Sequence, residues 1–106
     1  RRRTGLRAPA TADMDEACRW VAERAPASAV KWFNGLEATL QTLEVLPQRC
    51  PLAEESRAFD LEIRELVYGK QVGTYRVLFT IVENAVHILH LRHGRRRRLR
   101  PQKRTR

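Results

Sequence analysis

The apolar residues of this chain follow two different periods, one in each half of the sequence, and this change restricts the fold more than any other feature. In the first half they recur every three or four residues, as on one face of a helix. Asp13 and Glu16 have the spacing of a capping box, so a first helix is expected from there to about Arg24. A second helix is expected between Pro26, which suits a first turn, and Pro47, which stops it. Two helices joined by so few residues form an antiparallel hairpin.

The second half of the chain is rich in β-branched and aromatic residues, which favour strands. Strands are expected over residues 62–68, 74–82 and 85–92, with a weak edge strand over 6–8. Residues 47–61 have no period and are expected to form an ordered loop. The sequence therefore predicts an α+β domain, in which an N-terminal helical hairpin packs on one face of a three- or four-stranded antiparallel sheet. The other face of the sheet is expected to be open.

The net charge of +9 is concentrated at the two ends of the chain. Residues 1–11 contain four arginines and residues 95–106 contain eight basic residues, whereas residues 12–94 contain nine basic and twelve acidic residues, a net charge of −3. We therefore expect a single domain over residues 12–94, between a basic N-terminal segment and a basic, disordered tail. Such ends attract polyanions through counterion release, without sequence preference.

Other features restrict the location and the chemistry of the protein. No apolar run approaches the ~20 residues of a membrane-spanning helix, and no apolar segment follows the arginine-rich start as in a signal peptide. Cys18 and Cys50 are therefore expected to be reduced thiols in the cytoplasm. His87, His90 and His93 would alternate between the two faces of a strand, so they cannot bind one ion together. No metal and no small-molecule cofactor are expected.

The alternation of side chains along the strands predicts which residues face the open side of the sheet. On the middle strand, positions 75, 77, 79 and 81 are apolar or aromatic and are expected to face the helices, which places Arg76 on the open face. On the last strand, Leu89 is expected to face the helices and Ile88 the open side. His90 and Arg92 share the side of Ile88.

These positions bring guanidinium and imidazole groups together. Arg76 and Arg92 can converge with His90 at one end of the sheet, because neighbouring strands lie about 5 Å apart. Arg64 can join them if its strand presents it to the same face, which the pattern does not decide, and His93 follows just after the last strand. Arginine stabilises the charge of a phosphorane and histidine moves a proton near neutral pH, so this set suits metal-free cleavage of RNA. In the alternative interpretation, the strand arginines pair with nearby acids.

Several segments of the chain resemble the RelE/ParE toxin superfamily in their residues and in their order. They are Ala12–Ala17, Trp20–Pro26, Ala29–Phe33, Leu43–Pro47, Ile63–Leu66, Gly73–Phe79 and Leu89–Arg96. The resemblance implies the toxin of a type II toxin–antitoxin system, of the kind known from plasmid stabilisation, which a small antitoxin protein neutralises by wrapping its surface.

The resemblance implies two modes of action. RelE-like members cleave mRNA on the ribosome without a metal, and ParE-like members poison DNA gyrase. In the first mode, the phosphate-binding groups would be Arg64, Arg76 and Arg92. The proton donor would be His93 or His90, and the base would be Glu65 or the other histidine. Our leading expectation from the sequence is mRNA cleavage, with gyrase inhibition as the alternative and a non-toxic basic nucleic-acid-binding module as the third possibility.

Overall fold

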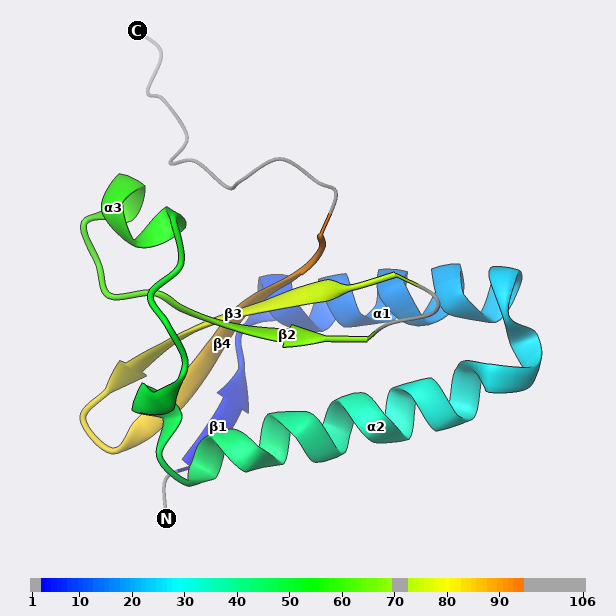
Figure 1. Cartoon of the computed structure of the whole chain (residues 1–106), viewed down its shortest axis with the longest axis horizontal. Helices are drawn as coiled ribbons and strands as arrows, with labels where there is room; N and C mark the ends of the chain where they lie inside the picture. Colours follow the sequence, from blue (N-terminus) through cyan, green and yellow to red (C-terminus); the bar gives the residue numbers. More distant parts are fainter. Residues whose placement is uncertain (1–2, 70–72, 95–106) are drawn as a thin grey trace, which may run out of the picture.

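The computed structural model describes residues 3–69 and 73–94 of the chain (Figure 1). In chain order the elements are β1 (Arg3–Leu6), α1 (Ala8–Arg24), the short 3-10 helix η1 (Pro26–Ser28), α2 (Ala29–Gln41), the 3-10 helices η2 (Thr42–Glu44) and η3 (Pro47–Arg49), α3 (Glu55–Phe59), β2 (Arg64–Tyr68), β3 (Tyr75–Val82) and β4 (Ala85–His93). The predicted basic tail, residues 95–106, lies outside the described residues.

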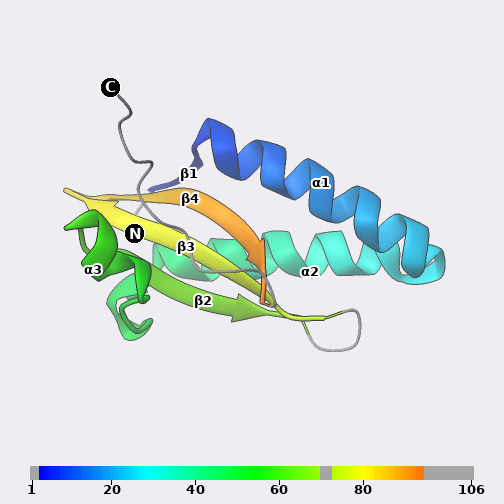
Figure 2. The ribbon, with the colours of Figure 1, turned by 90° about the horizontal axis from the view of Figure 1, so that it is seen from above.

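The predicted α+β class is confirmed. The helices α1 and α2 form a hairpin joined through η1, and the strands form one four-stranded sheet of order β1-β4-β3-β2 (Figures 1 and 2). The main core lies between the hairpin and one face of the sheet, where Val21, Leu36 and Phe79 are fully buried. Figure 1 shows α3 on the other side of the strands from α2.

The edge strand β1 differs from its prediction in position and direction. β2, β3 and β4 pair antiparallel, as expected. β1 begins at Arg3, ends at Leu6 and pairs parallel with β4, which makes the sheet mixed. Parallel neighbours need a long connection, and here that connection contains the whole hairpin together with β2 and β3. Four residues with the sequence Arg-Thr-Gly-Leu carry no alternation from which this pairing could be predicted.

The first helix begins earlier than the predicted capping box. α1 starts at Ala8, and Pro9 occupies its first turn, where the missing N–H of proline costs no hydrogen bond. Asp13 therefore lies inside the helix, and the prediction that it caps the helix is wrong. Its Oδ2 instead accepts a hydrogen bond from the Leu91 backbone N–H at 3.0 Å and lies 3.0 Å from Nδ1 of His90. Asp13 thus continues the pairing of β4 beyond the point where β1 ends.

A bulge in β4 shifts the faces of two residues. Phe79 pairs with Ile88 and Leu78 pairs with His90, so Leu89 is an extra residue on β4. Ile88 consequently faces the helices, where it is 1% exposed, and Leu89 packs on the other face. The predictions for Ile88 and Leu89 are therefore both wrong, because simple alternation does not allow for an inserted residue.

The face of the sheet that was predicted to be open is partly covered. Ala53, Ile63 and Leu78 form a second, smaller core on this face, with Leu89 packed against it. The cover comes from Ala53 and α3. They belong to residues 47–61, which were predicted as a loop and in fact contain η3 and α3. A pattern-based prediction misses them because neither helix is long enough to show a period.

Tyr68 fastens the end of β2 to α2. Its hydroxyl donates a hydrogen bond of 2.7 Å to the backbone carbonyl of Trp32. A Cβ at Gly35 would collide with the same hydroxyl, so a side chain at this position would displace Tyr68 from its contact with Trp32. The contact sets the distance between the end of β2 and α2.

We predict that Asp13→Ala lowers the free energy of unfolding by about 1–3 kcal/mol, because it leaves the partly buried N–H of Leu91 without an acceptor. Asp15→Ala, an exposed position on the same helix, is the matched control and should change stability by less than about 0.5 kcal/mol. Urea unfolding of both variants measures the difference. Equal stability of the two variants would show that the Asp13 contact contributes nothing.

Candidate functional site

Arg76, the residue at the centre of the predicted catalytic patch, is buried in an internal ion pair. Its guanidinium contacts Glu55 of α3 with Nη1–Oε2 and Nη2–Oε1 distances of 2.9 and 2.6 Å. Its Nε and Nη2 also donate to Oε1 of Glu65, on the neighbouring strand β2, at 2.8 and 2.7 Å. Arg76 is 4% exposed and Glu55 is 1% exposed, so all three groups lie in or next to the protein interior.

The two carboxylates keep the arginine charged. The hydrogen bonds to Glu55 raise the pKa of Arg76, and those to Glu65 act in the same direction against the effect of burial. All three guanidinium nitrogens of Arg76 donate to the carboxylates. The alternative interpretation, in which the strand arginines pair with nearby acids, therefore holds for Arg76, which pairs with Glu65. Glu55 was not singled out in the sequence, because it lies in a segment without a period.

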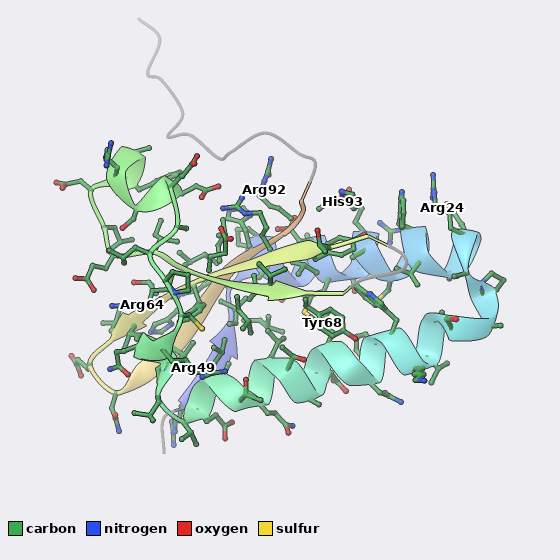
Figure 3. All side chains as sticks on the ribbon, in the orientation of Figure 1. Arg24, Arg49, Arg64, Tyr68, Arg92 and His93 are labelled. Carbon is green, nitrogen blue, oxygen red and sulfur yellow. The ribbon has the colours of Figure 1, made fainter. Side chains whose placement is uncertain are left out.

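Arg64 lies on the opposite face of the sheet from Arg76. Its Cα partner on β3 is Phe79, which faces the helices, whereas Arg76 pairs with Val67. The Arg64 guanidinium donates to the carbonyl of Cys50 at 2.7 Å and lies 3.7 Å from a carboxylate oxygen of Glu62. Figure 3 shows Arg64 near Arg49, well away from Arg92. Arg64 thus holds the chain that leads from η3 into α3.

His93 also lies on the helix side. It pairs with Tyr75 across β3 and β4, and its ring lies 5.2 Å from the ring of Tyr75 and 5.6 Å from that of Trp20 on α1. A Cβ at Gly73 would meet its Nε2 at 2.6 Å, so the turn before β3 packs closely on the imidazole. The sheet therefore separates His93 from Arg76.

His90 and Arg92 share the face of Arg76, as predicted. Arg92 is the direct cross-strand neighbour of Arg76, and His90 is that of Leu78. The His90 imidazole is held by Asp13 through the contact described above. The structure thus brings Arg76, Arg92, His90 and Glu65 to one side of the sheet, and it places Arg64 and His93 on the other.

A small apolar pocket lies beside this set, between α3, the sheet and the start of α1. It has a volume of about 310 Å³, and its lining includes Phe59, Leu61, Leu78 and Leu89, with Arg7, Glu55 and His90 as its polar residues. Such a lining suits an apolar side chain better than a phosphodiester. Among residues 3–69 and 73–94, no group of three histidine, cysteine or acidic side chains is placed to hold a metal ion.

Two further properties concern the thiols and membranes. Cys18 and Cys50 are both free thiols, and burial raises the pKa of each. Within the described part of the chain, no helix has the length and apolar character needed to cross a bilayer.

A helical hairpin packed against a four-stranded sheet is consistent with the fold of the RelE/ParE toxin superfamily, and the chain is a toxin of that superfamily. The family model described as the ParE toxin of the type II toxin–antitoxin system, parDE, matches residues 6–98. The chain therefore belongs to the ParE toxin family.

The structure is similar to a chain of the chromosomal ParDE toxin–antitoxin system from P. aeruginosa. The TM-score is 0.71 at 15% sequence identity, and the match covers 87% of this chain and 95% of the other. At this identity the likeness is one of fold. A comparison with curated proteins finds no match.

We predict that Arg76→Met lowers the free energy of unfolding by about 3–5 kcal/mol, because it leaves the Glu55 carboxylate buried without its cation. The double variant Glu55→Leu/Arg76→Met should recover most of this loss, since a buried ion pair can often be replaced by apolar residues of similar size. Glu65 is 23% exposed and can be solvated in both variants. Chemical denaturation of the single and the double variant measures their free energies of unfolding. A double variant as unstable as Arg76→Met would contradict this account of the ion pair.

Proposed function

We propose that this protein is the toxin of a type II toxin–antitoxin pair and that it inhibits growth by binding DNA gyrase rather than by cleaving RNA. Membership of the ParE family supports this target, because ParE-like members of the superfamily poison gyrase. The partner that neutralises it would be a cognate antitoxin protein. Since gyrase acts in the cytoplasm, the toxin would act there too.

The observation that carries the proposal is the internal neutralisation of Arg76. Metal-free RNA cleavage needs cations next to the phosphate and an acid and a base within hydrogen-bond reach of the reacting atoms. Arg76 donates instead to two carboxylates of its own chain, and Arg64 and His93 lie across the sheet from it. The six residues expected from the sequence therefore do not surround one phosphate. This arrangement favours a toxin that acts by binding a target protein and not by catalysing RNA cleavage.

The charge distribution fits a target that handles DNA. Of the 21 basic residues of the chain, 12 lie in residues 1–11 and 95–106, where there is no acidic residue. Such ends favour association with a polyanion or with a protein that carries one, and the attraction should weaken as salt concentration rises.

The test uses the purified wild-type protein and the double variant Glu55→Leu/Arg76→Met. We predict that the wild type inhibits DNA supercoiling by gyrase and leaves mRNA intact in a translating extract. The double variant should inhibit gyrase to within about threefold of the wild type, because Arg76 supports the fold and does not contact the target.

RNA cleavage that depends on Arg76 would contradict the proposal. If wild-type protein cleaves mRNA without a metal and the folded double variant loses about 10²–10³ in that rate, Arg76 is a phosphate ligand and the toxin is a ribonuclease. Circular dichroism of the double variant establishes that it is folded in either case.

A further inference from the structure

The small pocket between α3, the sheet and the start of α1 has a buried apolar floor and an exposed apolar rim. Ile63 and Leu78 belong to its floor and are 4% and 1% exposed. Phe59 and Leu61 line it as well, but they remain 37% and 47% exposed. Two large apolar side chains that stand open around one cavity form a patch that a ligand can cover.

The carboxylates in and near this pocket are engaged by groups of the protein itself. Glu55 is the one acidic residue in the lining that the described part of the chain forms, and both of its carboxylate oxygens accept from the Arg76 guanidinium. Asp13 does not line the pocket, and its Oδ2 contacts the Leu91 N–H and the His90 ring. The pocket therefore presents little negative charge to a ligand.

Arg7 supplies a positive charge at the rim. It lines the pocket and is exposed, so its side chain lies at the opening. Its backbone N–H donates to the Ile88 carbonyl at 2.9 Å, which holds the base of the side chain against β4. No carboxylate within residues 3–69 and 73–94 forms an ion pair with its guanidinium. The rim is thus complementary to an anionic group.

We propose that this pocket binds a small carboxylic acid with a compact apolar or aromatic body. The body would lie over Leu78 and Leu89, and the carboxylate would accept the paired N–H donors of Arg7. A volume of about 310 Å³ holds about ten groups of water size at ~30 Å³ each, so the ligand would have about ten non-hydrogen atoms.

Two other classes of ligand fit this pocket less well. A phosphate ester would have to leave much of its hydration shell for a lining in which Arg7 is the one cation without an ion-pair partner among the described residues. A wholly apolar molecule would fill the floor and leave the Arg7 guanidinium unused. The carboxylic acid uses both features. The site does not depend on the proposed gyrase target.

The test uses the purified full chain and three compounds of similar size. Phenylpropanoate carries the carboxylate, phenylpropanamide is its neutral counterpart, and phenylpropylamine has the opposite charge. Binding is followed by NMR through the methyl groups of Leu61, Leu78 and Leu89. We predict that phenylpropanoate binds with a Kd of about 0.1–1 mM, as expected for a ligand of this size. The amide should bind about fivefold more weakly, because an exposed ion pair contributes little, and the amine should bind more weakly still.

Two pairs of variants locate the contact. Arg7→Gln should lower the affinity for phenylpropanoate to that for the amide, whereas Arg3→Gln, the same change of charge at an exposed position outside the lining, should have no effect. Leu61→Ala should weaken both compounds about threefold through lost apolar contact, whereas Val45→Ala, an exposed position outside the lining, should weaken neither. All four changes replace exposed side chains, so the fold should be preserved.

Equal binding of phenylpropanoate and phenylpropanamide to the wild type would show that the pocket selects apolar bulk alone, and it would overturn the proposal. The proposal also fails if phenylpropanoate shows no saturable binding, if the shifted methyl groups lie outside the pocket, or if Arg7→Gln binds phenylpropanoate as tightly as the wild type. The measurement contains neither gyrase nor RNA, so its outcome is independent of the target of the toxin.

Discussion

The buried ion pair between Arg76 and its two carboxylates determines how the second face of the sheet is built. A guanidinium that is 4% exposed would strongly destabilise the fold without partners, because desolvation of a lone ion costs several kcal/mol. Glu65 supplies one carboxylate from the adjacent strand, and Glu55 supplies the other from α3. A helix of five residues is not stable by itself, so this contact and the small core around Leu78 hold α3 in place. The buried guanidinium of Arg76 on β3 thus determines where α3 packs on the sheet.

The bulge at Leu89 determines how β4 packs on the two faces of the sheet. By adding one residue, it allows both Ile88 and Leu89 to be buried, each on a different face. It comes just after the last residue that pairs with β1, and beyond it α1 replaces β1 as the neighbour of β4. Asp13 provides there the acceptor that a strand would have provided. A side-chain oxygen of Asp13 therefore replaces a backbone acceptor at the point where the pairing of β1 with β4 ends.

The sequence predicts the elements that have a period and misses those that do not. The hairpin, the two longer strands β3 and β4 and the faces of Arg76, His90 and Arg92 follow from apolar spacing over eight or more residues. Glu55 could not be assigned to Arg76, since the two lie 21 positions apart and nothing local links them. For Arg64, the alternation on β2 is ambiguous because both faces of that strand carry apolar residues. The predicted residues were thus mostly placed on the correct strands, while their partners, which decide what they can do, were not predictable.

An uncovered strand edge is a risk for a protein that exists alone, and this chain limits the risk without removing it. Edges are commonly protected by short length, by nearby lysines and by covering segments, and β2 has all three: five residues, Lys31 beside its end, and residues 51–53 along its beginning. What remains uncovered is too short to drive self-association of two like-charged edges.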